Sequence, residues 1–168
     1  MDIYILRHGE AQPRSKDVAE ADRKLTPQGR DDVERVSRLA RAAKVQPDLV
    51  LSSPYARARQ TAEVAIQAFE RLKSPLQETP ALLPGGSPKQ VWKEIKSHAG
   101  SRQLLLVGHE PQFSELVAYL LASPTLRLDL KKGALVRIRM DQLAGEPHGE
   151  LKWVLTPGLA KSATKRRQ

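Results

Sequence analysis

Two histidines and two arginines stand at or just beyond the ends of apolar runs, where they could bind and attack a phosphoryl group. Arg7 and His8 follow the first run, Arg57 lies shortly after the second, and His109 follows the third. A neutral imidazole is a competent nucleophile toward phosphorus and can carry a covalent phosphoryl group. Guanidinium groups bind phosphate oxygens in pairs and keep their charge at any working pH. This set of residues predicts a phosphoryl-binding pocket with a histidine nucleophile.

The apolar runs are typical of strands that are buried on both faces, which is the pattern of a parallel sheet. They cover residues 3–6, 49–51 and 104–107. Segments with helical spacing separate them, so the sequence predicts an α/β fold, a three-layer α/β/α sandwich with a mostly parallel, mixed central sheet. Ligands bind beyond the carboxyl ends of the strands in such a sheet, and the four candidate residues lie there.

Helix starts are marked by a hydroxyl side chain followed by proline, at Thr26-Pro27, Ser53-Pro54 and Ser87-Pro88. Gln90 adds a capping box to Ser87. With Ser53 as a helix cap, Arg57 is the fourth helical residue and leans toward an anion held above the helix start. Pro111 is expected to open a further helix after the third apolar run.

The remaining elements are predicted from periodicity. Residues 33–43 and 113–121 have apolar positions at helical spacing, and residues 62–72 are good helix formers. Residues 134–140 and 151–155 alternate between apolar and polar side chains, which indicates two late strands. Together these segments supply the helices and the mixed-direction strands of the predicted sandwich.

The charge of the chain is concentrated at its carboxyl end. The 168 residues carry a net charge of +9, and the last eight contain four cations and no anion. The rest of the chain is therefore only mildly basic, and its 4% aromatic content supplies few stacking platforms, so no nucleic-acid partner is expected. We expect one catalytic domain over residues 1–159 and a flexible basic tail over residues 160–168.

Composition also excludes several classes of protein. With no cysteine, the chain has neither a disulfide framework nor a thiolate zinc site. No run of 18 apolar residues could cross a membrane, and the first residues do not form a signal peptide. A cytoplasmic protein without membrane contact is the expectation.

Several motifs resemble the histidine phosphatase superfamily, which has the phosphoglycerate-mutase-like fold. They are Arg7-His8-Gly9, Ser53-Pro54-x-x-Arg57-Ala58-x-Gln60-Thr61 and Gly108-His109. The short chain, Leu25-Thr26-x-x-Gly29 and His109-x-Pro111 are most similar to the small phosphohistidine phosphatases of the SixA type. The resemblance extends to about Leu159 and implies the fold that periodicity predicts.

The resemblance implies roles for single residues. His8 is the phosphorylated nucleophile, and Arg7, Arg57 and His109 hold the phosphoryl oxygens, while Gly9 lets the backbone approach the ligand. The arginines beside His8 are expected to lower its pKa below the ordinary value of about 6.5. They also argue against a cation in the pocket, so neither a metal nor a cofactor is expected. Three further residues match no functional position and are expected to be ordinary surface or structural residues: Arg59, His98 and His148.

The general acid is less clearly marked. Mutases and many acid phosphatases of the superfamily have a carboxylate after the third strand region, but residues 79–87 contain none here. The small phosphatases share that lack and have an acidic residue three positions before an arginine in the first loop. Glu20 and Arg23 match this spacing, which makes Glu20 the candidate general acid, with Asp17 and Asp22 as rivals.

The missing carboxylate bears on the substrate. An alkoxide leaving group needs a proton, and losing a positioned acid costs roughly 10²- to 10⁴-fold in rate. The imidazole of phosphohistidine is easier to expel, and a short chain without a lid suits a protein surface. The sequence therefore predicts a metal-independent phosphatase for phosphohistidine in a phosphorelay or phosphotransfer protein. The alternatives are a phosphatase for small monoesters, such as sugar phosphates or nucleotides, and a non-catalytic phosphate- or RNA-binding module.

Overall fold

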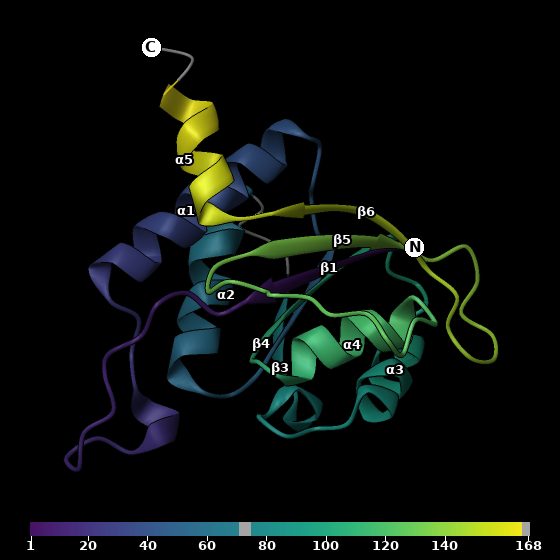
Figure 1. Ribbon diagram of the computed structural model, residues 1–168, viewed down its shortest axis with the longest axis horizontal. Coiled ribbons are helices and arrows are strands. Elements are labelled where there is room, and N and C mark those ends of the chain that lie inside the picture. The colour runs from purple at the N-terminus through teal and green to yellow at the C-terminus, as the bar shows by residue number, and fades with distance from the viewer. Residues whose placement is uncertain (71–74, 166–168) are drawn as a thin grey trace.

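A six-stranded sheet lies between two layers of helices in the computed structural model, which describes residues 1–70 and 75–165 (Figure 1). The strand order is β3-β2-β4-β1-β5-β6. The first four strands in this order run parallel, and β5 and β6 are antiparallel to their neighbours. The bounds are β1 (Asp2–Arg7), β2 (Leu49–Ser52), β3 (Leu76–Glu78), β4 (Gln103–Gly108), β5 (Leu135–Arg139) and β6 (Glu150–Leu155). The predicted sandwich with a mostly parallel, mixed sheet is confirmed.

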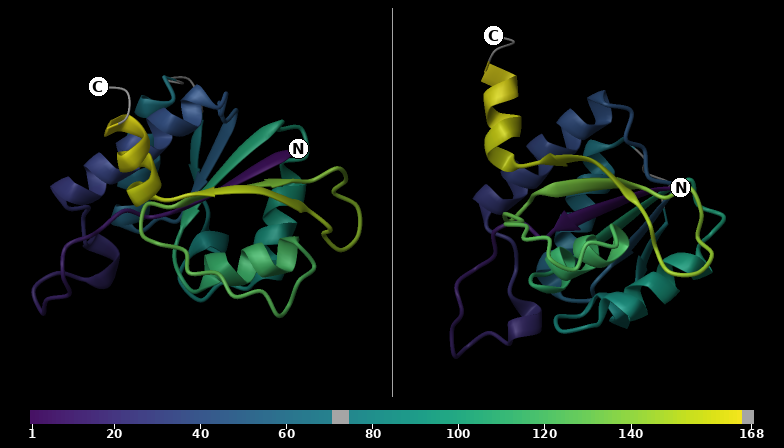
Figure 2. Two further views of the ribbon diagram at one scale, coloured as in Figure 1. Left: turned by 45° about the horizontal axis from the view of Figure 1, so that its top comes forward. Right: turned by 45° about the vertical axis from the view of Figure 1, so that its right-hand side comes forward.

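Helices cover both faces of the sheet (Figures 1 and 2). One face packs against α1 (Pro27–Ala42), α2 (Ala56–Ala68) and α5 (Pro157–Lys165), and the other against α3 (Pro88–Ser97) and α4 (Gln112–Leu120). Strand side chains alternate between these two cores: Ile3 and Ile5 face α3 and α4, whereas Tyr4 and Leu6 face α1 and α2. The central strands are therefore apolar on both faces, as the sequence predicted.

Of the three helix starts predicted from a hydroxyl side chain and a proline, those at Thr26 and Ser87 are confirmed. The Thr26 hydroxyl accepts a hydrogen bond from Gly29 N at 3.0 Å and caps α1. Ser87 and Gln90 form the expected capping box at the start of α3. Pro111 lies at the N-cap of α4, directly before its first residue.

The helix start predicted at Ser53-Pro54 is wrong. Ser53 does not cap α2, which begins at Ala56 with Tyr55 at its N-cap, so Arg57 is the second helical residue and not the fourth. The Ser53 hydroxyl lies 2.8 Å from His109 Nε2 instead. The chain therefore makes a short turn after β2 before the helix starts.

The helix predicted over residues 62–72 also has different bounds. It begins six residues earlier, at Ala56, and ends at Ala68. Two residues later Glu70 has a positive φ of 55°, which is incompatible with a continued α-helix. Residues 71 and 72 lie outside the described part of the chain.

The carboxyl-terminal helix α5 spans the boundary expected between domain and tail. Ala160 is fully buried in the same core as α1 and α2. The separation of a flexible tail from the domain at residue 160 stays a prediction. Within the described residues, no helix is both long and apolar enough to cross a membrane.

Candidate active site

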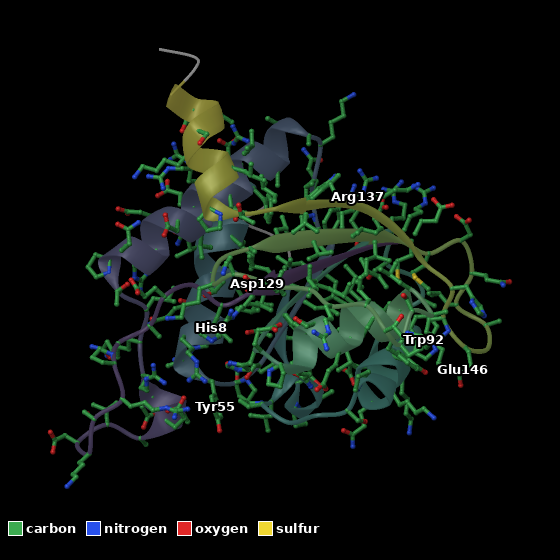
Figure 3. All side chains as sticks on the ribbon, viewed as in Figure 1. His8, Tyr55, Trp92, Asp129, Arg137 and Glu146 are labelled. Atoms are coloured by element: carbon green, nitrogen blue, oxygen red, sulfur yellow. The ribbon has the colours of Figure 1, made fainter. Side chains whose placement is uncertain are left out.

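The predicted site residues meet at the carboxyl ends of β1, β2 and β4. Arg7 pairs with Gly108 in the register of β1 and β4, and His8 N donates to the Gly108 carbonyl at 2.9 Å. This bond joins the ends of the two strands, so the rings of His8 and His109 lie with their centroids 5.1 Å apart. Figure 3 shows His8 and Tyr55 beyond the carboxyl end of β1, at the opposite end of the sheet from Trp92.

His8 is held in one tautomer by two neighbours. Its Nδ1 lies 2.7 Å from the Gly9 carbonyl oxygen, which can only accept, so Nδ1 carries the proton. Arg57 Nε donates to His8 Nε2 at 3.3 Å, which requires a lone pair on that nitrogen. Burial, with the charges of Arg57 and Arg7, lowers the pKa of His8 to about 4. The predicted direction of this pKa shift is confirmed. At neutral pH the ring therefore presents an unprotonated Nε2.

Thr61 fixes the backbone beside His8. Its hydroxyl donates to the Arg57 carbonyl at 2.7 Å and accepts from Gly9 N at 3.1 Å. A side chain on Gly9 would bring Cβ within 2.7 Å of the Gly29 carbonyl oxygen, so only glycine lets this loop pack against the start of α1. Gly9 thus supports the His8 ring through its carbonyl, and its predicted contact with substrate stays a prediction.

Arg57 is 5% exposed and has partners on three sides. Its Nη1 donates to the Glu20 carbonyl at 2.8 Å, its Nη2 lies 3.2 Å from the Glu20 carboxylate, and its guanidinium lies 5.0 Å from the centre of the Tyr55 ring. Burial lowers the pKa of Arg57, but a guanidinium stays protonated in proteins. Arg57 is therefore a buried cation held rigidly against His8.

Glu20 lies in the short 3-10 helix η1 (Glu20–Asp22) and contacts three arginines. Arg23 Nη1 donates to both carboxylate oxygens, at 2.7 and 3.0 Å, and Arg14 Nε lies 3.3 Å from one of them. The hydrogen bond from Arg23, with the charges of Arg57 and Arg14, holds the pKa of Glu20 below its ordinary value. An ionised carboxylate is a poor proton donor, so the role of Glu20 as general acid stays a prediction, whereas its contact with Arg57 is direct.

His109 and Arg7 complete the set. His109 is 2% exposed, and burial, with the charges of His8, Arg57 and Arg7, lowers its pKa to about 3. Arg7 Nη1 donates to the Leu130 carbonyl at 2.6 Å, which anchors the guanidinium. Its Nε is buried without a hydrogen-bond partner among the described residues. Both side chains line the same pocket as His8.

The pocket has a volume of about 480 Å³ and a cationic lining. Five cationic side chains line it, from the described part of the chain: Arg7, Arg14, Arg23, Arg57 and Lys132. Such a concentration of charge, with an unprotonated imidazole among it, can bind a phosphoryl group and attack its phosphorus. Among residues 1–70 and 75–165, no three histidine or acidic side chains are grouped to hold a metal ion.

Glu110 also lines the pocket and was not singled out from the sequence. Its carboxylate accepts hydrogen bonds from Ser114 N at 2.9 Å and from the Ser114 hydroxyl at 2.5 Å. It thereby satisfies a free amide in the first turn of α4. An acidic residue four positions before a serine, at the expected start of a helix, is the signal that could have indicated this capping role.

The comparisons with known proteins place the chain in a family. The model of the histidine phosphatase superfamily (branch 1) matches residues 3–83. The phosphohistidine phosphatase SixA homolog of Haemophilus influenzae is 30% identical over 128 residues, which cover 71% of this chain and 77% of that protein. The chain belongs to the histidine phosphatase superfamily.

Two further comparisons extend over nearly the whole of this histidine phosphatase. Phosphohistidine phosphatase SixA of Escherichia coli is 28% identical over 165 residues, covering 97% of this chain and 98% of the relative. The solved structure of the protein histidine phosphatase SixA complexed with tungstate has a TM-score of 0.82 at 27% identity, covering 94% of this chain and 98% of that one. The resemblance inferred from the motifs is confirmed, and so is its fold.

The remaining candidates of this histidine phosphatase lie away from the pocket. Arg59 is half exposed near Glu63 and Glu78, as a surface charge should be. His98 lies 3.5 Å from Glu94 in α3. Three others are exposed and line no part of the pocket: Asp17, Asp22 and His148.

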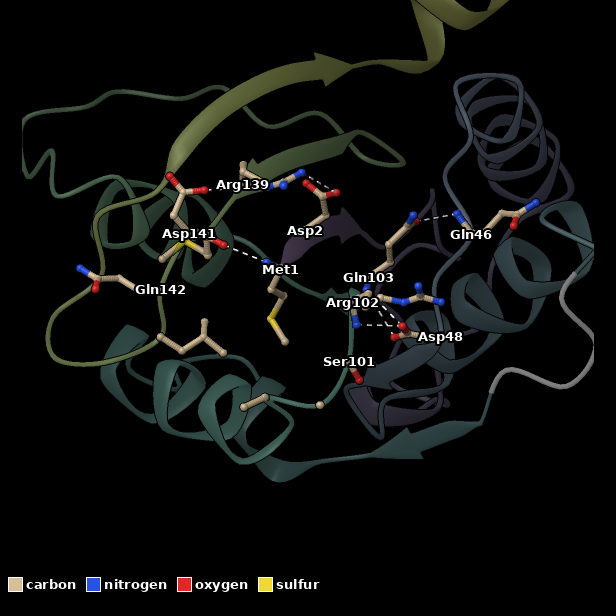
Figure 4. A pocket seen from close by; sticks show the side chains of 14 residues that line it. Met1, Asp2, Gln46, Asp48, Ser101, Arg102, Gln103, Arg139, Asp141 and Gln142 are labelled. Atoms are coloured by element: carbon tan, nitrogen blue, oxygen red, sulfur yellow. Dashed lines mark hydrogen bonds and ion pairs between the residues drawn. The ribbon is translucent and has the colours of Figure 1, made fainter.

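A larger hollow, of about 680 Å³, lies at the opposite, amino ends of β1 and β4 (Figure 4). Its carboxylates already have partners: Asp2 pairs with Arg139 at 3.6 Å, Asp141 lies 3.9 Å from Arg139, and Asp48 accepts from Arg102 N at 2.8 Å. Neither of the two buried histidines lines it. The smaller pocket, which both buried histidines line, is therefore the candidate active site.

Proposed function

We propose that this protein is a phosphatase that hydrolyses phosphohistidine in a protein substrate, such as a phosphorelay or phosphotransfer protein, through a phospho-His8 intermediate. The observation that carries this proposal is the unprotonated Nε2 of His8, held beside the buried cation Arg57 in a pocket that His109 also lines. The two SixA proteins to which the chain is similar, named as phosphohistidine phosphatases, support the same substrate class.

The first chemical step forms one phosphorus–nitrogen bond and breaks another. His8 Nε2 attacks the phosphorus, and the bond from phosphorus to the substrate imidazole breaks. Arg7, Arg57 and His109 are proposed to hold the three equatorial oxygens, where charge is largest in the transition state. The substrate histidine leaves as neutral imidazole when its other ring nitrogen already carries a proton, so this step needs no separate proton donor.

The second step reverses the roles. Water attacks the phosphorus of phospho-His8, the bond to His8 Nε2 breaks, and phosphate departs with a proton released to solvent. Because Nδ1 keeps its proton against the Gly9 carbonyl, His8 leaves as the same neutral tautomer that began the cycle. One imidazole thus leaves in each step, which suits a site whose residues 79–87 contain no carboxylate.

The rim of the pocket favours a macromolecular phosphoryl donor. Arg14, whose side chain is 83% exposed, and Lys132, which is also exposed, line the opening. Neither is covered by a lid in the described residues, so the histidine of a folded partner can approach. We propose that the protein acts in the cytoplasm.

The test is a comparison of substrates. Purified protein is incubated with a phosphohistidine peptide, with a phosphohistidine-bearing phosphotransfer protein, and with a panel of sugar phosphates and nucleotides. We expect kcat/KM to be highest for the protein-borne phosphohistidine and to vanish in His8→Ala. A monoester with a higher kcat/KM, or turnover that survives His8→Ala, would overturn the proposal.

A further inference from the structure

Ser53 and His109 form a buried pair, of which His109 lines the pocket. Ser53 is fully buried directly after β2, and its backbone N donates to the Val107 carbonyl of β4 at 2.9 Å. This bond places the Ser53 hydroxyl 2.8 Å from His109 Nε2. The turn that displaces the start of α2 to Ala56 frees the hydroxyl for this contact.

The proton of the Ser53 hydroxyl has one available acceptor among the described residues. The hydroxyl oxygen already accepts from Tyr55 N at 3.3 Å. If His109 Nε2 carried a proton and donated it to Ser53, the hydroxyl proton would be left unpaired in a fully buried place, which is costly. The hydroxyl therefore donates to Nε2, and Nε2 holds the lone pair.

The other ring nitrogen of His109 then carries the proton. Nδ1 is buried and has no hydrogen-bond partner among residues 1–70 and 75–165, although His109 lines the pocket beside His8. We propose that Ser53 is a positioning residue that fixes His109 as the Nδ1–H tautomer, so that the neutral ring donates a hydrogen bond to a phosphoryl oxygen.

This arrangement gives the two histidines complementary faces. His8 keeps a lone pair on Nε2 for the phosphorus, because the Gly9 carbonyl holds its proton on Nδ1; Arg57 Nε, which donates to this lone pair in the empty site, gives way to the phosphoryl group. His109 turns an N–H toward the anionic oxygens, because Ser53 occupies its lone pair. Both rings are neutral at pH 7, so the tautomer alone decides whether His109 donates to the substrate or repels it. The catalytic half of this proposal rests on the proposed phosphatase function, whereas the tautomer does not.

The tautomer can be read directly by NMR. The chain has four histidines, so a long-range ¹H–¹⁵N spectrum of ¹⁵N-histidine-labelled protein at pH 7 resolves them, and His109→Gln assigns the His109 signals. We expect a protonated Nδ1 and an unprotonated Nε2 for His109. A protonated Nε2 in the wild-type protein would overturn the proposal whether or not any substrate is turned over.

Variants link the tautomer to rate. Ser53→Ala should populate the Nε2–H form of His109 and lower kcat about 10-fold, with little change in KM. Ser53→Thr keeps the hydroxyl, so it should have the wild-type tautomer of His109 and a kcat close to that of the wild type. Ser52→Ala is the matched control: it removes a buried hydroxyl that donates to the Ser53 carbonyl, and it should leave the tautomer unchanged. A rate loss in Ser53→Ala without a change of tautomer would contradict the proposal and indicate a packing role.

Discussion

Arg57 Nε lies 3.3 Å from His8 Nε2, and this contact joins the start of α2 to the end of β1. A guanidinium N–H can only donate, so the contact exists only while Nε2 is unprotonated. The Gly9 carbonyl, 2.7 Å from Nδ1, favours the same tautomer from the other side of the ring. The arginine that we propose as a phosphoryl ligand therefore also favours the unprotonated Nε2 of the proposed nucleophile.

Arg57 should be far more sensitive to substitution than its neighbour Arg59. Arg57→Ala removes charge that stabilises the transition state and should lower kcat/KM at least 100-fold, or ~2.7 kcal/mol. Arg59→Ala is the control from the same helix, and because its side chain is half exposed it should stay within about three-fold of the wild type. Steady-state kinetics with a phosphohistidine peptide measures both. Reversed sensitivities would mean that the wrong arginine has been assigned.

Glu20→Gln separates two roles of one carboxylate. If Glu20 holds Arg57 in place, loss of its charge should lower kcat/KM about five-fold, by the same factor for every leaving group. If Glu20 donates a proton, the loss should grow as the leaving group becomes more basic. A series of aryl phosphates measured beside a phosphohistidine peptide distinguishes the two. We expect the uniform loss, because arginines on Glu20 keep its pKa low.

The pH profile should extend unusually far into acid. The pKa of His8 is lowered to about 4, so its Nε2 stays unprotonated well below the ordinary histidine range. We expect kcat/KM to change little between pH 7 and about pH 5 and to fall as the pH approaches 4. A pH–rate profile that declines with an apparent pKa near 6.5 would show that His8 is not the buried neutral nucleophile.

Stability should depend on pH in the same range. Between about pH 6.5 and pH 4 the unfolded chain binds more protons at His8 than the native protein does, so the free energy of unfolding should decrease as the pH falls. His109, whose pKa is lowered to about 3, acts in the same direction. Urea unfolding at several pH values measures this slope, and His8→Ala should reduce it. An unchanged slope in His8→Ala would contradict the burial of a neutral His8.

Chelation should leave the activity intact. We propose that Arg7 and Arg57 supply the positive charge that a metal ion provides in other phosphatases, so turnover in excess EDTA should remain within about two-fold of the untreated rate. The assay compares treated enzyme with and without added Mg²⁺. If EDTA abolished turnover and added Mg²⁺ restored it, the activity would depend on a bound metal ion and the account would be contradicted.

Residue types and order were enough to predict which side chains meet. The apolar runs at residues 3–6, 49–51 and 104–107 became neighbouring parallel strands, and strand polarity alone then brings their carboxyl ends to one edge. The polar residues after them must share that edge, as His8 and His109 do. The predicted fall in the pKa of His8 had the right direction, but burial, which a sequence does not reveal, is its largest cause.

The contacts between the loops were not predictable from local patterns. Ser53-Pro54 has the pattern of a helix cap, yet the serine hydroxyl contacts His109, 56 residues along the chain. Glu20 contacts Arg57 across 37 residues, through a loop that has only a short 3-10 helix. Both interactions depend on the position that a loop adopts against the folded sheet, and local sequence propensities carry no information about that position.

The covalent step is tested most directly by trapping the phosphoryl group on the enzyme. The protein is mixed with a radiolabelled phosphohistidine peptide, quenched in base during turnover, digested and mapped by mass spectrometry. We predict phosphate on His8 in an acid-labile, base-stable linkage, as a phosphoramidate requires, with none in His8→Ala and slower labelling at the same residue in His109→Ala. Acid-labile phosphate on His109, or an active wild-type enzyme that never becomes labelled, would contradict the account.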